Sequence, residues 1–296
     1  MAKRFFFFDL PNERSSHSSP TISGGGIIIP VSILLWWCTH TFQHPYFIAG
    51  LMIIGAVSYI DDIKSLPVRI RGFVQIVSVL LLCYETDVFH YPWYFVVLVC
   101  LLAVAFMNAY NFMDGINGMT GLYSLLAFGT LLYINEQQLR FIDNEIIYFS
   151  GIAILVFLVF NLRRHAKWFA GDVGGFTIAF ILAFLTLKLI IQSGNFFYIL
   201  IFLVYATETV FTIIQRLFMH ENIFLPHRKH LYQYLSNEAG FSHAGVSLAY
   251  TLFQGITNVL VLYYLHNPMV MLIIFFCIAT GYVCLKSYIY RRYLFL

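Results

Sequence analysis

Residues 45–62 read PYFIAGLMIIGAVSYIDD, an uncharged and mostly apolar run that ends in two adjacent aspartates. An apolar run of about 17–25 residues is long enough to cross the hydrocarbon core of a bilayer as a helix. The same alternation continues along the chain, where polar clusters interrupt the hydrophobic stretches at 9–17, 61–64, 108–115, 169–172 and 226–230. The pattern predicts membrane-spanning helices that repeatedly return polar groups to one face.

The composition argues against a water-soluble protein. Hydrophobic residues make up 60% and charged residues 10% of the 296 residues, whereas a soluble domain carries roughly 25% charged residues. We therefore predict an all-α, polytopic integral membrane protein that forms a single domain over 1–296. About ten transmembrane helices can be drawn, at 24–40, 45–60, 70–84, 92–109, 117–134, 146–162, 174–193, 196–214, 244–265 and 268–288.

The distribution of positive charge orients these helices. When the connections are assigned alternately to two faces, fifteen of the seventeen Lys and Arg residues fall on the face that holds the N-terminus. Loops rich in Lys and Arg stay in the cytoplasm. Both termini are therefore predicted to be cytoplasmic, together with active-site loops at about 1–23, 61–69, 110–116, 163–173 and 215–243.

The first candidate cluster is the aspartate pair that ends the quoted stretch. Adjacent carboxylates at a membrane surface repel each other unless a cation or a proton lies between them. Asp61 and Asp62 thus favour a cation-binding or proton-transfer site, although a solvated helix end would explain them equally well. Lys64 offers a point charge for a phosphate group.

Two further clusters add oxygen ligands on the same face. Asn108, Asn111 and Asp114 are spaced i, i+3 and i+6, which gathers them on one loose face of a helix end. Asp172 lies at the entrance to another span, where it could also act as an ordinary helix N-cap. Because Mg²⁺ typically uses one or two carboxylates plus substrate phosphates, the combined set fits a metal–diphosphate site.

Basic residues complete the set in two loops. His227, Arg228 and His230 form a cluster in the longest predicted cytoplasmic loop, where a phosphate is a better partner than a metal because of the positive charge between the histidines. A plain surface loop is the alternative. Near the N-terminus, a second group could jointly bind an anion: Asn12, Arg14 and His17.

Taken in order, these clusters resemble the polyprenyl-phosphate N-acetylhexosamine-1-phosphate transferases, which form glycosyltransferase family 4 and are relatives of phospho-N-acetylmuramoyl-pentapeptide transferase. The resemblance runs through nearly the whole chain. It is carried by DLPNERSSHSSPTISGGG at 9–26, YIDDIKSLPVRIRGFVQ at 59–75, NAYNFMDGINGMTG at 108–121, KWFAGDVGG at 167–175 and IFLPHRKHLYQYL at 223–235.

The resemblance implies a reaction and its partners. N-acetylhexosamine-1-phosphate would pass from UDP-GlcNAc or a related UDP-N-acetylhexosamine to undecaprenyl phosphate, which releases UMP and makes the first lipid-linked sugar of a cell-surface polysaccharide. The expected cofactor is Mg²⁺, with Mn²⁺ as an alternative ion. The expected setting is the bacterial inner membrane with a cytoplasmic active site, no nucleic-acid partner, and a homodimer compatible with the family.

Residue roles follow from the matched motifs only. The resemblance implies that Asp172 holds the metal, and that Asp61 orients or deprotonates the lipid phosphate or, in a competing scheme, forms a covalent aspartyl intermediate. The supporting and catalytic polar set would be Asp62, Asp114, His227 and His230. Substrate contacts would come from Lys64, Asn108, Asn111, Asn161, Phe169, Arg228, Asn12, Arg14 and His17.

The sequence departs in three places from the pattern of the related pentapeptide transferases, and the first two departures argue against a pentapeptide-carrying donor. Those enzymes have Asp where Asn117 stands, and PHRKHLYQYL looks like the loop of enzymes that start O-antigen and other surface polysaccharides. The family usually has a membrane helix before the first motif, where this chain has only MAKRFFFF.

A membrane transporter is the competing interpretation, since carboxylates in membrane proteins also mark ion paths. A transporter should place them near mid-membrane in broken helices, whereas here only Glu208 and Lys188 lie well inside predicted spans.

Overall fold

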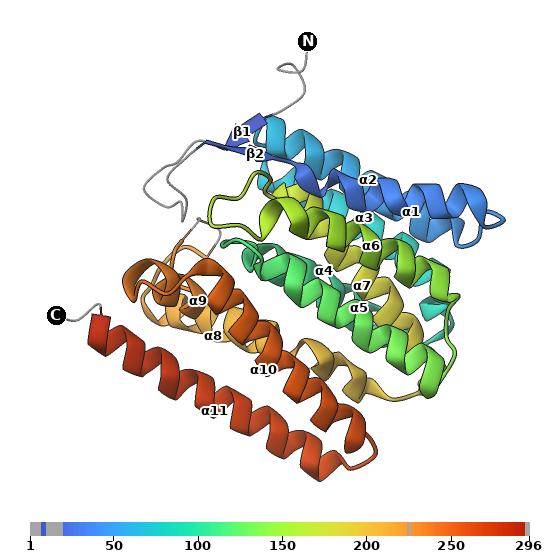
Figure 1. Ribbon diagram of the computed structural model, residues 1–296. Helices are drawn as coiled ribbons and strands as arrows, with labels where there is room; N and C mark the ends of the chain where they lie inside the picture. The colour runs from blue at the N-terminus through green and yellow to red at the C-terminus, as the bar shows by residue number, and fades with distance from the viewer. Residues whose placement is uncertain (1–6, 10–19, 224, 226, 294–296) are drawn as a thin grey trace.

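The computed structural model describes residues 7–9, 20–223, 225 and 227–293. Within these ranges the chain is helical except for one small sheet (Figure 1). The elements in chain order are β1 (Phe7–Asp9), β2 (Thr21–Ser23), η2 (Gly25–Ile27), α1 (Ile28–Thr39), α2 (Pro45–Ile63), α3 (Val68–Glu85), η3 (Val88–His90), α4 (Trp93–Phe112), α5 (Met119–Gln137), α6 (Asn144–Asn161), α7 (Gly171–Ser193), η4 (Phe196–Phe202), α8 (Leu203–Phe218), α9 (Leu231–Gln233), η5 (Tyr234–Glu238), α10 (His243–Tyr263) and α11 (Pro268–Tyr293).

Helix α7 lies at the centre of the bundle. It packs against α2, α4, α5 and α1. In its most apolar 18-residue stretch 72% of the residues are buried, compared with 17% in that of α11. A helix that is hydrophobic on all sides is expected to be buried in this way. The start of α7 is therefore surrounded by other helices, and a polar group placed there must meet partners from them.

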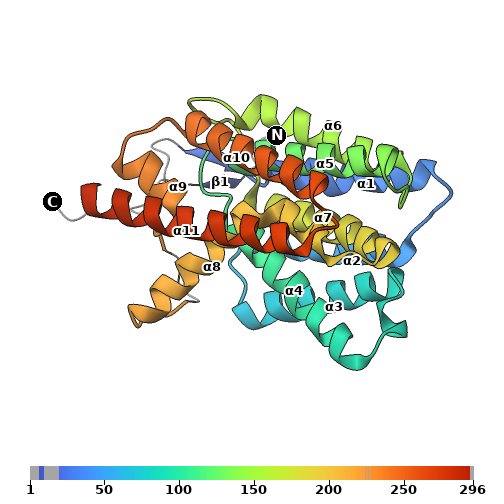
Figure 2. The ribbon, with the colours of Figure 1, turned by 90° about the horizontal axis from the view of Figure 1, so that it is seen from below.

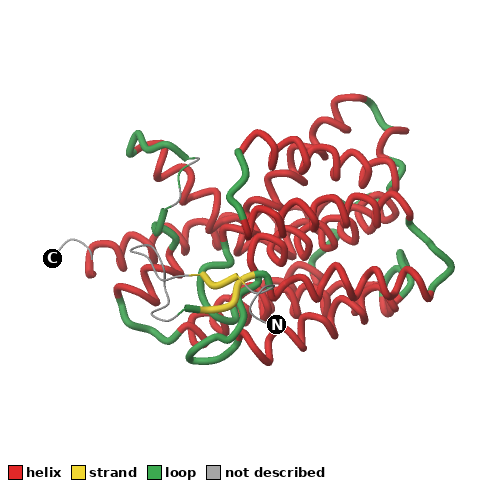
Figure 3. The backbone as a smooth tube through the Cα atoms, turned by 90° about the horizontal axis from the view of Figure 1, so that it is seen from above, coloured by secondary structure: helices red, strands yellow, loops and turns green. Residues whose placement is uncertain are grey.

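The sheet joins the N-terminal segment to the loop that precedes α7. β1 and β2 pair antiparallel, with Phe8 opposite Ile22, and a parallel bridge links Ile22 to Trp168. The following residues continue the contact, because Gly25 and Gly26 donate their backbone N–H groups to the carbonyls of the same loop, at 2.9 and 3.1 Å. Figure 3 shows the sheet in yellow at one end of the bundle, among the connecting loops.

In the described part of the chain, seven helical segments are long and apolar enough to cross a membrane. They are Pro45–Ile63, Trp93–Phe112, Asn144–Asn161, Gly171–Ser193, Phe196–Phe218, His243–Tyr263 and Pro268–Tyr293. The chain is thus a multi-pass, all-helical membrane protein apart from its small sheet. The count of ten spans and the cytoplasmic position of both termini stay predictions.

The other three predicted spans also coincide with helices. Each of these helices is either too short or too polar to count as a membrane-crossing helix by length and composition. α1 is short, so that with η2 it covers only Gly25–Thr39. α3 carries Arg69, Arg71 and Glu85, and α5 includes Thr, Ser, Tyr, Asn and Glu side chains that lower its hydropathy. Charged and polar positions in α3 and α5 are compatible with a bundle interior, where neighbouring helices supply their partners.

The segment Phe196–Phe218 changes direction where η4 gives way to α8. Gln254 of α10 satisfies the interrupted backbone there, since its Oε1 accepts from Val204 N at 2.8 Å and its Nε2 donates to the carbonyl of Leu200 at 3.3 Å. Figure 2 shows α8 leaving the bundle at an angle to α10 and α11. The break therefore directs α8 and the loop that follows it toward the end of the bundle that carries the sheet.

The contact between Gly26 and α7 yields the first testable prediction. A Cβ atom at Gly26 would lie 2.3 Å from the Cα of Gly174 and 2.6 Å from the carbonyl oxygen of Ala170. We expect Gly26→Ala to destabilise the protein by about 1–3 kcal/mol, because a rigid backbone cannot move aside for the added methyl group. The measurement is the unfolding temperature in detergent. Gly129→Ala is the matched control, since a Cβ there meets no atom within 4 Å, and an equal fall in both variants would contradict the prediction.

Candidate active site

The end of α2 caps the beginning of α7. Asp62 accepts hydrogen bonds from the backbone N–H groups of Asp172 and Val173, at 2.8 and 3.1 Å. The first N–H groups of a helix have no partner within the helix, and a carboxylate is favoured at that end of its dipole. Gly171 is required beside this cap, because it has φ +68° and a Cβ there would lie 2.5 Å from Asp62 Oδ2. Asp62 thus links the polar cluster at the end of α2 to the polar cluster at the start of α7.

Around this cap, two more carboxylates meet one guanidinium group. Nη1 of Arg71 donates to Oδ2 of Asp61 at 3.0 Å and lies 3.7 Å from Oδ2 of Asp172. Asp61 also accepts from the backbone N–H of Leu66, and Asn111 Nδ2 donates to Asp172 Oδ1 at 3.0 Å. Side chains from α2, α3, α4 and α7 therefore converge at one end of the bundle.

The geometry removes the simplest structural explanation for Asp172. The N-cap role that an Asp at this position could have played is performed by Asp62 instead. The Asp172 carboxylate faces Asn111 and Arg71, and carboxylate and amide oxygens are the ligand types that Mg²⁺ prefers. The donor set consequently fits the metal proposed for Asp172, and Arg71 supplies the positive charge between the carboxylates. Among the described residues no three His, Cys, Asp or Glu side chains are grouped closely enough to hold a metal by themselves.

The predicted substrate-binding residues Asn108 and Lys64 differ in their contacts and exposure. Asn108 lies one helical turn before Asn111 and donates to Gln75 Oε1 and to the carbonyl of Val104, both at 2.8 Å. Lys64 is exposed, and no hydrogen bond or ion pair links its side chain to another residue in the described part of the chain. The basic side chain that reaches the carboxylates is Arg71, which the sequence reasoning did not select.

Asp114 lies in the loop between α4 and α5, outside the membrane-spanning helices. Burial raises the pKa of its carboxyl group to about 6, an effect that the charge of Asp62 reinforces. The neighbouring Gly115 is in contact with Tyr232, whose hydroxyl donates to the carbonyl of Phe112 at 2.9 Å. The loop after α4 therefore contacts the segment after α8 through Tyr232.

The residues expected around the nucleotide have structural partners. Asn161 is buried, with Oδ1 accepting from Gly118 N at 2.7 Å and Nδ2 donating to the carbonyl of Trp168 at 2.9 Å. Asn117 is also buried and donates to the carbonyl of Arg163 at 2.8 Å. Phe169 is half-buried in the same loop and is held through its backbone by the β2 segment. These contacts fix the floor of the loop region, and the substrate-binding roles of Asn161 and Phe169 stay predictions.

In the long loop, His227 and His230 have different environments. The half-buried ring of His227 accepts a hydrogen bond from the backbone N–H of Lys229 at Nδ1, 3.3 Å away, so its proton resides on Nε2. Burial, together with the positive charges of Arg216 and Lys286, lowers the pKa of His227 to about 3. The imidazole is consequently neutral at physiological pH and presents an N–H donor.

His230, by contrast, is only 2% exposed and its Nδ1 lies 3.3 Å from Oε1 of the membrane carboxylate Glu208. The predicted catalytic role of His230 stays a prediction, and the structure places its ring against Glu208. Arg228, which follows His227 in the sequence, is half-buried. The three remaining predicted contacts lie outside the described residues: Asn12, Arg14 and His17.

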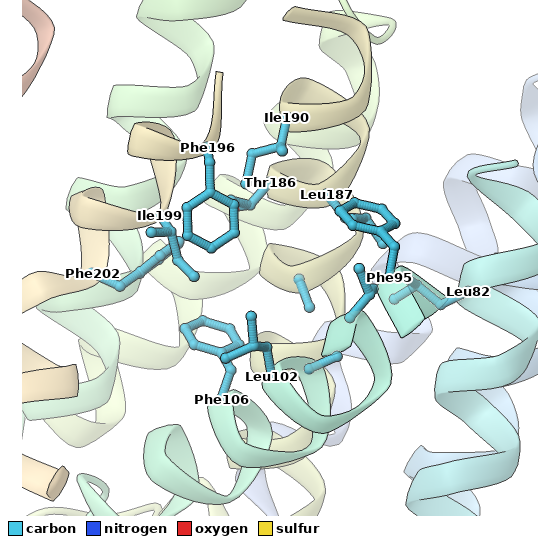
Figure 4. A pocket seen from close by; sticks show the side chains of 13 residues that line it. Leu82, Phe95, Leu102, Phe106, Thr186, Leu187, Ile190, Phe196, Ile199 and Phe202 are labelled. Atoms are coloured by element: carbon cyan, nitrogen blue, oxygen red, sulfur yellow. The ribbon is translucent and has the colours of Figure 1, made fainter. Parts of the chain in front are cut away.

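An apolar cavity lies in the membrane part of the bundle. Thirteen side chains from α3, α4, α7 and η4 line it (Figure 4), among them Phe95, Phe106 and Phe202. Phe106 precedes Asn111 by five residues, which is about 7.5 Å along the helix axis. The first lining residue on α7, Ala183, follows Asp172 by eleven residues, which is about 16 Å along the helix axis. The cavity therefore lies deeper in the bundle than the carboxylates.

The raised pKa of Asp114 generates a prediction about stability. A carboxyl group whose pKa rises from 3.8 to about 6 on folding binds its proton more tightly in the folded state. Its contribution to stability is present below pH 4 and is lost as the pH rises through 6. We expect the advantage of Asp114→Asn over the wild type in free energy of unfolding to be roughly 2 kcal/mol larger at pH 7.5 than at pH 4.5. Unfolding temperatures at the two pH values measure this, and an advantage no larger at pH 7.5 than at pH 4.5 would contradict it.

Comparison with known proteins was consistent with this geometry. Residues 44–190 match the model of glycosyl transferase family 4, a range that spans α2 to α7 and includes every carboxylate of the converging cluster. An undecaprenyl-phosphate alpha-N-acetylglucosaminyl 1-phosphate transferase of Thermotoga maritima is 28% identical, with 81% of this chain and 76% of that protein covered. A phospho-N-acetylmuramoyl-pentapeptide-transferase of Thermotoga petrophila is 24% identical, with 82% and 84% covered.

A second undecaprenyl-phosphate alpha-N-acetylglucosaminyl 1-phosphate transferase, from Yersinia pestis, is 32% identical over 58% of this chain and 52% of its own length. Relatives of two different activities thus share the segment that brings the carboxylates together. On this evidence the chain belongs to glycosyl transferase family 4.

Proposed function

We propose that this protein transfers N-acetylhexosamine-1-phosphate from a UDP-N-acetylhexosamine to undecaprenyl phosphate. The observation that carries the proposal is the convergence of Asp61, Asp172 and Arg71 at one end of a membrane bundle. A charged site at the end of apolar helices is where a lipid phosphate and a water-soluble nucleotide sugar can meet. The relatives named as undecaprenyl-phosphate alpha-N-acetylglucosaminyl 1-phosphate transferases support the same chemistry.

The reaction exchanges one diphosphate bond for another. A phosphate oxygen of undecaprenyl phosphate attacks the phosphorus that carries the sugar, and the bond from that phosphorus to the bridging oxygen breaks. The electron pair leaves with UMP, while the sugar remains on the lipid through a new diphosphate. Because the bonds broken and formed are alike, catalysis depends on positioning and on stabilising charge rather than on a large driving force.

The carboxylate cluster supplies the positioning. Asp172 would hold Mg²⁺ together with substrate phosphate oxygens, and the ion would neutralise charge that develops on the diphosphate. Asp61 would orient the lipid phosphate, assisted by Arg71, whose guanidinium group can pair with a phosphate as it does with a carboxylate. Asp62 holds the start of α7, so its contribution is to keep Asp172 in place.

The loop after α8 would contact the donor. Neutral His227 presents an N–H group suited to a phosphate oxygen, and Arg228 adds positive charge. Beyond the polar site, the apolar cavity along α4 and α7 suits part of an isoprenoid chain. We place the site at the cytoplasmic face of the bacterial inner membrane, where the product would begin a cell-surface polysaccharide. A transporter is not supported, since the named relatives are transferases and the carboxylates of this cluster lie at helix ends.

The direct test uses the purified full chain with undecaprenyl phosphate, Mg²⁺ and a panel of UDP-N-acetylhexosamines. We expect UMP release that requires the lipid phosphate and produces a lipid-linked sugar, detectable by chromatography and mass spectrometry. Chelation of the metal should stop turnover, and Mg²⁺ or Mn²⁺ should restore it. Absence of UMP with every donor, or UMP release without lipid, would refute the proposed function.

The choice of basic residue gives a sharper prediction. Arg71→Gln should lower kcat/KM by roughly 10–100-fold, because a hydrogen bond to a charged group is worth about 1.5–3 kcal/mol. Lys64→Gln is the matched control and should change kcat/KM by less than about twofold, since its exposed side chain takes no part in the cluster's hydrogen bonds. A larger loss in the Lys64 variant would reverse the assignment.

A further inference from the structure

Glu208 is a carboxylate inside a membrane-spanning segment, away from the site described above. It lies in α8, within the apolar stretch Phe196–Phe218, and its exposure is 0%. A charge in the hydrocarbon region is costly unless it is paired and hydrogen-bonded, and such residues usually serve a function. The partners of its hydrogen bonds indicate which segments Glu208 holds in place.

Its two oxygens connect three elements. Oε2 accepts from the hydroxyl of Tyr250 in α10 at 2.6 Å, and Oε1 accepts from the hydroxyl of Tyr282 in α11 at 3.2 Å. Oε1 also accepts from the backbone N–H of Leu231, and His230 Nδ1 is 3.3 Å away from it. Neither ring nitrogen of His230 has a hydrogen-bond partner among the described residues, and the Glu208 carboxylate is the charged group that its Nδ1 approaches.

The loop side of this contact leads to the active site. The ring of His230 lies between those of His227 and Tyr232, with centroids 4.9 and 5.4 Å away. Tyr232 in turn donates to the carbonyl of Phe112, at the end of α4 and two residues before Asp114. An unbroken series of contacts therefore runs from Glu208 in the membrane to the polar loop after α4.

A second set of bonds stiffens the same region. Lys286 of α11 donates to Thr212 Oγ1, one turn beyond Glu208, at 2.7 Å. At the other end of α8, Arg216 pairs with Glu221 at 3.2 Å, and Glu221 also accepts from Lys229. The loop is thus held at two points, by Glu221 through Lys229 and by Glu208 through His230 and Leu231.

We propose that Glu208 is a positioning residue, which holds the segment His227–Leu231 in place so that His227 and Arg228 face the diphosphate. The inference rests on the proposed function. Glu208 touches no substrate itself and acts through His230 and the backbone of Leu231. A residue with this role contributes to the reaction step by fixing the geometry of other groups. Its removal should therefore lower kcat more than it raises KM.

The test compares three variants of the full chain. Glu208→Gln keeps the size of the side chain and one acceptor for Leu231, but it removes the negative charge beside His230. Tyr250→Phe removes one hydrogen-bond donor and leaves the carboxylate. Glu85→Gln is the matched control, because Glu85 also faces a histidine, His44 at 2.8 Å, and accepts from two backbone N–H groups, but at the opposite end of α2 from the aspartate pair.

Two measurements are needed. Steady-state UMP release gives kcat and KM, and timed trypsin digestion with mass spectrometry gives the rate of cleavage after Arg228 and Lys229. We expect Glu208→Gln to lower kcat at least tenfold with KM within threefold, and to speed cleavage of the loop several-fold. Tyr250→Phe should show smaller changes in the same direction. Glu85→Gln should leave both readouts within twofold, even if its unfolding temperature falls.

The outcomes separate this inference from the proposed function. Wild-type kinetics and loop cleavage in folded Glu208→Gln would overturn the positioning role, as would equal losses in the Glu85 control. If the wild type releases no UMP with any donor, the proposed function fails, and the digestion alone decides whether Glu208 orders the loop. If Glu208→Gln does not fold, Tyr250→Phe decides, and unchanged kcat in that variant would overturn the inference.

Discussion

The hydrogen bonds from the start of α7 to Asp62 are the constraint on which the site depends. α2 and α7 are separated by more than a hundred residues, yet the Asp62 carboxylate accepts two backbone N–H groups of α7 directly. This contact sets the end of one helix against the beginning of another. Asp61 and Asp172 are then forced into the same small volume, where like charges need the cation that Arg71 provides in this structure.

A second half of the site is built on different helices. The loop after α8 is held from below by Glu208 and from the side by Tyr232, which reaches the end of α4. The carboxylate half belongs to the central bundle around α7, whereas the histidine half belongs to α8, α10 and α11. Tyr232 is one side chain that joins them, through its hydrogen bond to the carbonyl of Phe112.

The sequence was sufficient to predict the helices and the meeting of their polar ends. Hydrophobic runs are long and distinct in a membrane protein, and each predicted span coincides with a helix. Partners across the bundle could not be predicted in the same way. That Asp62 caps α7 could not be predicted from its position next to Asp61. Lys64 is nearer to the aspartates in sequence, but Arg71, one helical turn into α3, is the basic residue that pairs with Asp61. Glu208 was visible as an isolated carboxylate, but its link to His230 depends on how α8 breaks from η4.

The contact between Gly115 and Tyr232 has a consequence for the natural variation of this protein. A methyl group at position 115 would fall 2.2 Å from the phenol oxygen. The two positions therefore cannot drift independently. A lineage that gains a side chain at 115 must first, or at the same time, accept a smaller residue at 232 and lose the bond to Phe112.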